Sequence, residues 1–190
     1  MNDIFAVRTH EKMKEVLWKP DAPGPETHYY MIRGGSDKKN ITVWESGTVG
    51  GEYIKTYGHY HVDDLPETYW ILEGEGIALL QKRSDSAPDA LEEFKVVPVK
   101  AGDVLNIPIR YGHLVVNVGK TFFTTSDDSP VNFGNDSASM PAHADYKPVQ
   151  ALGGFAYFVV EHEGKPALVR NKKYTSIGTE DLAGLPVVAL

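Results

Sequence analysis

Glycine and proline interrupt this chain too often for it to build long helices. Its 190 residues include 18 glycines and 12 prolines, and both residue types disfavour a helix interior. Between them lie short runs rich in β-branched and aromatic residues, such as 41–45, 68–73, 76–82, 94–99 and 104–108. Short strands without long helices between them predict an antiparallel sandwich or barrel rather than a parallel α/β sheet.

The remaining segments complete an all-β prediction. We expect one short N-terminal helix, because Thr9 can cap it, Met13, Val16 and Leu17 recur at helical spacing, and Pro20 ends it. Further strands are expected at 27–33, 52–61, 114–118 and 121–125, with turns and loops at 74–76, 84–92 and 126–149, and a last hairpin from 155–161 and 167–170. The length predicts one domain, residues 1–190, with a barrel core at about 27–170.

Composition excludes several classes of partner and site. Lys and Arg number 19 against 26 Asp and Glu, a formal charge of −7, so we expect neither nucleic acid nor an anionic membrane as a partner. No apolar stretch approaches the ~18 residues of a membrane span, and residues 1–20 lack the apolar core of a secretory signal. We therefore expect a cytoplasmic protein. The chain has no cysteine, so any metal must be held by imidazole and carboxylate groups.

One group of residues has the donors for such a metal. His59 and His61 are two apart, so in a strand they lie on one face while Tyr60 faces the opposite way. Glu67 follows after a connection long enough to reverse the chain, and His113 is more distant. Three imidazole nitrogens and one carboxylate around a first-row divalent cation leave two octahedral positions open for substrate or water.

A His-x-His pair alone is more often a polar surface pair, but its surroundings here form two motifs. Six residues separate Glu67 from Gly74, and later five separate Gly102 from Pro108, four follow to His113, and three more to Asn117. This pattern resembles the two signature motifs of the cupin superfamily. The resemblance implies a jelly-roll β-barrel that holds a metal inside through His59, His61, Glu67 and His113. Arg110 stands where the second motif usually has glycine, so either the turn before His113 differs or Arg110 points into the cavity.

A narrower resemblance extends from about Tyr29 to Lys172. The chain is similar to the cupin-type phosphoglucose isomerases, best known from archaea, in the segments Thr42-Val43, Thr48 to Tyr53, Thr56 to His61, Glu67-Thr68-Tyr69 and Pro108 to Asn117. Those enzymes interconvert glucose 6-phosphate and fructose 6-phosphate, in glycolysis and gluconeogenesis. The resemblance implies one divalent ion per chain, with Fe²⁺ expected first and Mn²⁺, Zn²⁺ or Ni²⁺ as alternatives.

The same resemblance assigns roles to individual residues. Glu67 is implied as both metal ligand and catalytic base, and His143 as a second catalytic residue near the sugar oxygens. The residues implied in binding the sugar phosphate are Thr42, Thr56, Gly58, Tyr69, Tyr146 and Tyr29; Tyr30 competes with Tyr29 for that place. The family also has a tyrosine shortly after the strand that follows the third histidine, whereas here Thr124, Thr125 and Ser126 occupy that neighbourhood. One cavity contact is therefore expected to be either missing or replaced from the long loop 126–149.

These residue types suit an aldose–ketose isomerase. A divalent metal stabilises the enediolate formed when a carbon acid loses its proton, and Glu67 can move that proton between C2 and C1; a hydride shift is the rival path. The phosphate dianion needs local donors, and Lys55 or Arg110 could add positive charge. His10, His28 and His162 have no partner in the sequence and are expected at the surface.

Two other functions stay open at this point. One is a cupin dioxygenase that uses the same ligands to activate oxygen, although the phosphate-type residues around Thr56 and Gly58 would then have no role. The other is a non-catalytic cupin that binds a sugar phosphate, which would not need an intact metal set. Strand pairing through an exposed N-terminal strand favours a homodimer.

Overall fold

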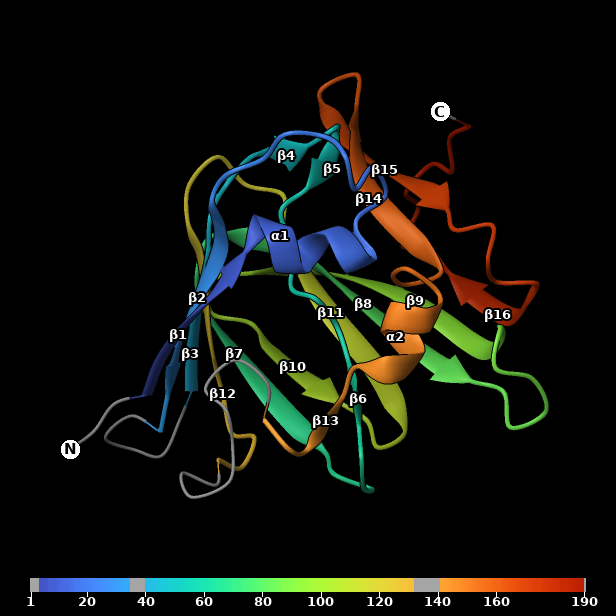
Figure 1. The fold of residues 1–190 in the computed structure, drawn as a ribbon, viewed down its shortest axis with the longest axis horizontal. Coiled ribbons are helices and arrows are strands. Elements are labelled where there is room, and N and C mark those ends of the chain that lie inside the picture. Colours follow the sequence, from blue (N-terminus) through green and yellow to red (C-terminus); the bar gives the residue numbers. More distant parts are fainter. Residues whose placement is uncertain (1–3, 35–39, 132–140, 190) are drawn as a thin grey trace.

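A six-stranded antiparallel sheet forms one wall of the molecule. The computed structural model describes residues 4–34, 40–131 and 141–189, and in this part the strands follow the order β1-β2-β3-β12-β7-β10. Their bounds are β1 Ile4–Thr9, β2 Thr27–Arg33, β3 Asn40–Trp44, β7 Glu67–Glu73, β10 Val104–Ile107 and β12 Phe123–Asp127. Figure 1 shows this sheet on the left, with β10 crossing toward the centre.

A second sheet, with the order β11-β8-β9-β16, forms the opposite wall. It consists of β8 Glu75–Arg83, β9 Ala90–Lys100, β11 Tyr111–Asn117 and β16 Ser176–Asp181, the last pairing parallel to β9. Only Gly74, with a φ of +85°, separates β7 from β8, yet these strands belong to different sheets. The expected hairpin at 74–76 is therefore wrong, because this turn carries the chain from one wall to the other.

The segment 52–61 joins the second wall as an irregular strand. It was expected to be continuous, but the structure divides it into β5 Glu52–Tyr53 and β6 Tyr60–His61. Between them the Thr56 amide donates to Val115 O at 2.9 Å, and His59 and His113 exchange two backbone hydrogen bonds of 3.2 and 3.0 Å. This pairing brings His59 directly opposite His113.

A smaller sheet, β15-β14-β5-β4, covers the upper end of the barrel in Figure 1. It contains β4 Thr48–Val49, β14 Tyr157–His162 and β15 Lys165–Arg170. Glu163 and Gly164 turn the chain between β14 and β15 with φ values of +53° and +75°, as a tight two-residue hairpin requires. The last expected hairpin is thus confirmed.

Short helices pack beside the barrel. The N-terminal one is α1 His10–Met13 continued by the 3₁₀ turn η1 Lys14–Val16, and the Lys12 amide donates to the Thr9 side chain that caps it. Met13 and Val16 are fully buried. The second is α2 Lys147–Ala151, which follows the two-residue strand β13 Ala144–Asp145. None of the helices described is long and apolar enough to cross a membrane.

The space between the two walls is filled by large apolar side chains and the site described below. The core includes Trp44, Leu79, Phe94, Leu114 and Phe123, each almost fully buried. The predicted all-β cupin jelly roll with a short N-terminal helix is confirmed.

The expected loops and the tail contain more secondary structure than the sequence analysis predicted. β9 begins inside the expected loop 84–92, and β16 lies in the tail. The expected loop 126–149 contains β13 and the start of α2, and its residues 132–140 lie outside the described part.

Candidate functional site

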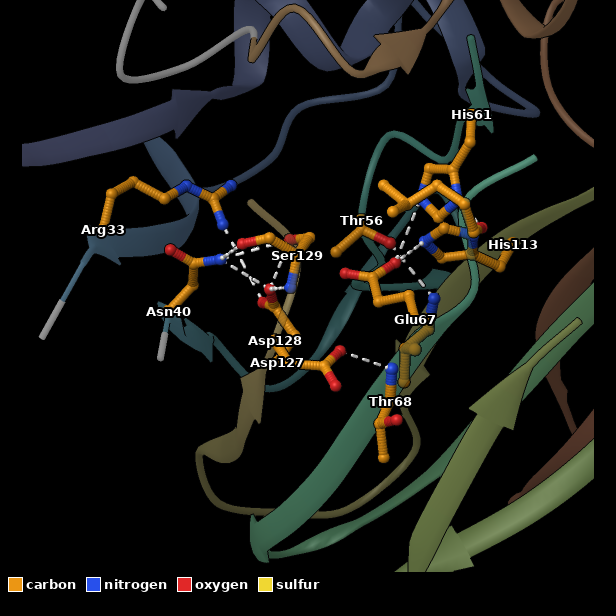
Figure 2. A network of polar contacts seen from close by, with 12 residues as sticks. Arg33, Asn40, Thr56, His61, Glu67, Thr68, His113, Asp127, Asp128 and Ser129 are labelled. Atoms are coloured by element: carbon orange, nitrogen blue, oxygen red, sulfur yellow. Dashed lines mark hydrogen bonds and ion pairs between the residues drawn. The ribbon is translucent and has the colours of Figure 1, made fainter. Parts of the chain in front are cut away.

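Three histidines and a glutamate converge inside the barrel. His59 forms an isolated β-bridge with His113, which lies on β11. His61 is the last residue of β6, and Glu67 is the first residue of β7. One ligand atom from each of them lies within 4.8 Å of all the others. Figure 2 shows His61 and His113 pointing at the Glu67 carboxylate. Tyr60, between the two histidines, points away and accepts a hydrogen bond from Gln81. The expected alternation is therefore present.

The chemistry of this cluster fits a divalent cation. Nε2 of His113 and Nε2 of His61 lie 2.9 and 3.3 Å from Glu67 Oε2, but these buried atoms and His59 Nε2 lack a well-aligned hydrogen-bond partner among the described residues. His61 Nδ1 lies 2.7 Å from Leu65 O, which fixes the tautomer that leaves Nε2 with a lone pair facing the cluster. Imidazole nitrogens and a carboxylate are the donors that first-row metals accept.

Burial and charge act on the cluster in opposite directions. Burial favours the neutral form of Glu67, but the neighbouring His113, His61 and His59 hold the pKa of this carboxyl well below its ordinary range. Burial, together with His113, lowers the pKa of His59 well below its ordinary value. These shifts favour an ionised Glu67 carboxylate and a neutral His59 imidazole, the forms in which these two groups bind a metal.

A cavity opens beside the cluster and contains almost every residue that the sequence singled out. It encloses about 500 Å³ of space between atoms, its open mouth included. Its lining includes these expected residues: Tyr29, Thr42, Thr56, Gly58, His59, Glu67, Tyr69, His113, His143 and Tyr146. His61 belongs to the cluster but does not line the cavity.

The segment before His59 is shaped by its neighbours. Thr56 Oγ1 accepts a hydrogen bond from the Val115 amide at 3.0 Å, so its own hydrogen is left to donate elsewhere. Gly58 has a φ of +81°, and a Cβ there would lie 2.7 Å from the Phe155 ring. Only glycine fits at this position without moving the backbone.

The aromatic and imidazole groups of the cavity surround His59 and His113. The Tyr146 ring centroid lies 5.3 Å and the His143 centroid 6.2 Å from that of His59, and Tyr69 lies 5.6 Å from His113. β13 pairs with β6, and this pairing carries the segment containing His143 and Tyr146 to the cluster. Of the two competing tyrosines, Tyr29 lines the cavity, whereas the Tyr30 hydroxyl donates to Glu45 at 3.0 Å.

The sequence reasoning missed a polar network at one end of the cavity. Asp127 Oδ1 accepts hydrogen bonds from Asn40 at 2.6 Å and from the hydroxyl and amide of Ser129, and Arg33 Nη1 lies 3.9 Å from Asp127 Oδ2 (Figure 2). Burial, followed by the charge of Glu67, raises the pKa of Asp127 to about 6. Arg33, Asp127 and Ser129 line the cavity.

Arg8 is the second feature that the sequence reasoning missed. It lies at the cavity, where the sequence had suggested Lys55 or Arg110 as the source of positive charge. Arg8 lines the cavity, whereas the buried Lys55 pairs with Glu52 and donates to Val16 O. Arg110 has a φ of +68°, in the region that favours glycine, and its side chain pairs with Asp85 outside the cavity. Neither Lys55 nor Arg110 can therefore contact a ligand in this cavity.

One expected surface histidine is buried. His28 is completely inaccessible to solvent and its Nε2 lies 2.9 Å from Nδ1 of His10, with the two rings stacked. These residues are 18 apart in the sequence, and the close approach depends on the pairing of β1 with β2. The expectation of two unpartnered surface histidines is therefore wrong.

Comparison with known proteins identifies the family. The family model for glucose-6-phosphate isomerase matches residues 26–176. The chain belongs to this family. It is 31% identical to a glucose-6-phosphate isomerase of Pyrococcus abyssi over 180 residues, covering 93% of this chain and 86% of that protein. The match to the Thermococcus onnurineus glucose-6-phosphate isomerase is 32% over 134 residues, or 70% of this chain and 62% of that protein.

Two solved structures overlap with about half of this chain. An oxalate oxidase overlaps with 53% of this chain and 40% of its own, at 18% identity and a TM-score of 0.38. A protein described as a predicted oxalate decarboxylase from Thermotoga maritima overlaps with 52% and 76%, at 21% identity and a TM-score of 0.38. This chain spans less than two thirds of the length of the Thermococcus onnurineus glucose-6-phosphate isomerase.

Proposed function

We propose that this chain is a metal-dependent glucose-6-phosphate isomerase that interconverts glucose 6-phosphate and fructose 6-phosphate. The observation that carries this proposal is the convergence of His59, His61, Glu67 and His113 at the side of one cavity, in a chain of the glucose-6-phosphate isomerase family. We further propose that residues 1–190 act as one cupin domain. In metabolism this reaction serves glycolysis and gluconeogenesis.

The four residues would hold one divalent ion, with Fe²⁺ as the first candidate and Mn²⁺, Zn²⁺ or Ni²⁺ as the alternatives. When bound, such an ion supplies the positive charge that stabilises the developing negative charge on the sugar oxygens. The buried donors described above support this assignment, because an imidazole or carboxylate atom without a partner is costly to bury.

The chain's own residues supply the remaining chemistry. In the direction from glucose 6-phosphate, Glu67 takes the proton from C2 of the open-chain aldose and returns it to C1, while O2 loses its proton and O1 gains one. His143, which lines the cavity beside His59, exchanges the proton with these oxygens. Tyr69 borders the sugar, and the phosphate lies among Thr42, Thr56, Gly58, Tyr146 and Tyr29. Each change is a proton transfer, so the atoms balance without an outside reductant.

A coupled assay tests this function on the purified full chain. Fructose 6-phosphate is the substrate, and the glucose 6-phosphate formed is oxidised by a dehydrogenase that reduces NADP; metal content is measured on the same preparation. We expect turnover with phosphorylated sugars and none with glucose or fructose. A metal-loaded protein that binds fructose 6-phosphate without converting it would instead be a sugar-phosphate-binding cupin, and oxygen consumption with a bound substrate would indicate a dioxygenase.

The oligomeric state belongs to the same proposal. β1 is the end strand of the six-stranded sheet in the described part of the chain, with β2 as its partner. An unpaired strand edge can pair with a second copy, and we propose a homodimer on this basis. Light scattering on the eluted peak would give twice the chain mass if the proposal is right.

A further inference from the structure

Arg8 brings a buried positive charge to the cavity from a strand outside the family match. It lies on β1, opposite Tyr29 of β2, whereas the family model begins at residue 26. Arg8 is only 2% exposed and lines the cavity. A charged group this deeply buried is costly unless it is held by hydrogen bonds or opposite charge, so its position calls for a reason.

Its immediate contacts fix the guanidinium group in one orientation. Arg8 Nε donates to the Tyr29 hydroxyl at 2.9 Å. The guanidinium carbon lies 5.7, 5.5 and 5.8 Å from the ring centroids of Tyr29, Tyr57 and Tyr146, which are cation–π distances. These aromatic faces and the hydrogen bond to Tyr29 help to hold a planar cation at the wall of the cavity.

The same hydrogen bond connects Arg8 with the Thr56–Gly58 segment. The Tyr29 hydroxyl oxygen accepts from Arg8 and from the Tyr57 amide, the latter at 3.3 Å. Since this oxygen already accepts twice, its hydrogen is left as a donor, as is that of Thr56, which accepts from Val115. Both residues line the cavity. This part of the cavity therefore presents donors, and an anionic group of several oxygens is their natural acceptor.

Arg8 lines the same cavity as His59, Glu67 and His113 of the metal-type cluster. The Tyr146 ring is in contact range of both, 5.8 Å from the Arg8 guanidinium carbon and 5.3 Å from the His59 ring centroid. The other cavity arginine, Arg33, lies 3.9 Å from Asp127. A ligand that carries both sugar oxygens and an anionic group matches this arrangement.

We propose that Arg8 is a specificity-determining residue that supplies the positive charge for the substrate's phosphate group. The fork of guanidinium donors suits a phosphate, and a chain with a net charge of −7 needs a local cation to attract a dianion. This inference rests on the proposed function, because it assigns the phosphate of that substrate to the part of the cavity that Arg8 lines.

Inorganic phosphate is the probe for this assignment. Its inhibition constant against fructose 6-phosphate is measured for the wild type, Arg8→Gln and Arg8→Lys, together with KM and kcat. For Arg8→Gln we expect the inhibition constant and KM to rise by about 10- to 100-fold, the loss expected for a charged hydrogen bond, with a smaller change in kcat. Arg8→Lys keeps the charge without the fork and should recover part of the affinity.

Arg110→Gln is the matched control, since Arg110 is exposed and pairs with Asp85 outside the cavity; its phosphate inhibition should equal that of the wild type. If Arg8→Gln does not fold, Arg8→Lys decides, because its inhibition constant should still exceed that of the wild type. An unchanged constant in the folded Arg8 variants overturns the proposal while leaving the isomerase function intact. Conversely, if the wild type shows no turnover, calorimetry with inorganic phosphate tests Arg8 independently: weaker binding in Arg8→Gln supports it, and equal binding overturns it.

Discussion

Glu67 Oε2 lies 2.9 Å from Nε2 of His113, and both side chains are nearly inaccessible to solvent. The two residues come from opposite walls of the barrel, β7 in one sheet and β11 in the other. Their approach places a carboxylate beside imidazole nitrogens inside a cavity, with its pKa held well below the ordinary range against the effect of burial. Closure of the barrel therefore creates the candidate metal centre.

Glu67→Gln separates metal binding from proton transfer. The amide oxygen of Gln can still be a ligand, but the side chain cannot accept a proton. We therefore expect a variant that keeps part of its metal and loses turnover by about 10²-fold or more, the contribution of a general base. Metal analysis and the coupled fructose 6-phosphate assay, run on the same sample, measure both quantities.

Solvent deuterium distinguishes the two pathways in the wild type. A proton shuttle through Glu67 should introduce label at C1 of fructose 6-phosphate or C2 of glucose 6-phosphate, whereas a hydride shift should not. If metal-loaded Glu67→Gln works at nearly the wild-type rate and the product of the wild type carries no label, Glu67 is a ligand only.

The candidate metal residues could be predicted because they depend on short-range spacing. His59 and His61 share a face through the two-residue period of a strand, and the intervals from Glu67 to Gly74 and from Gly102 to Asn117 carry the cupin resemblance. The structure brings these side chains together. Thr42, Thr56, Tyr69 and Tyr146 could be assigned only through the resemblance, because a threonine or tyrosine in a strand has no distinguishing pattern.

Other features depend on long-range pairing and were not predictable. Arg8 enters the cavity because β1 adds to the edge of the sheet beside β2, which nothing in the local sequence specifies. The Gly74 turn resembles a hairpin locally, and only the partners of β7 and β8 reveal the change of sheet. β16 is a polar strand at the surface, so it lacks the alternation of apolar residues that marks a half-buried strand.

Gly58→Ala should damage the site through a steric clash. The added Cβ would lie 2.7 Å from Phe155, next to His59, in a residue with a φ of +81°. We expect the free energy of unfolding to fall by about 1–3 kcal/mol from the backbone conformation alone, with a further loss from the clash and reduced turnover. Urea unfolding and the isomerase assay measure the two effects.

Gly102→Ala is the matched control for that experiment. Gly102 also has a positive φ, +93°, but an added Cβ there would have no atom within 4 Å. It should therefore show the backbone cost without the clash and without loss of turnover. Equal losses of stability and activity in the two variants would contradict the steric account of Gly58.

His28 should make stability depend on pH. Burial first, then the charges of His10 and Lys55, lower the pKa of His28 from 6.5 to about 4. The unfolded chain therefore binds a proton below pH 6.5 that the folded chain does not bind until about pH 4. Stability is greatest above the unfolded pKa and falls as the pH decreases through this window, by up to about 3 kcal/mol from this group.

The variant His28→Gln should lose this part of the pH dependence. Urea unfolding of the wild type and the variant is compared at pH values above and within that window. The difference in the free energy of unfolding between the wild type and His28→Gln should become smaller or change sign toward acid pH. Only the wild type has a buried histidine whose protonation destabilises the folded state there. His162→Gln, on the β14–β15 hairpin, serves as the control and should follow the wild type. Parallel curves for the wild type and His28→Gln would show that burial of His28 does not affect acid stability.

The most direct test of the central claim is a metal titration of chelator-treated protein, with fructose 6-phosphate turnover followed at each addition. For the wild type we predict almost no turnover without metal and a linear rise that ends at one Fe²⁺ per chain. His113→Ala, which removes a ligand from the cluster, should neither retain the metal nor regain turnover. Full turnover by the metal-free wild type, or a full equivalent of metal retained by His113→Ala, would contradict the account.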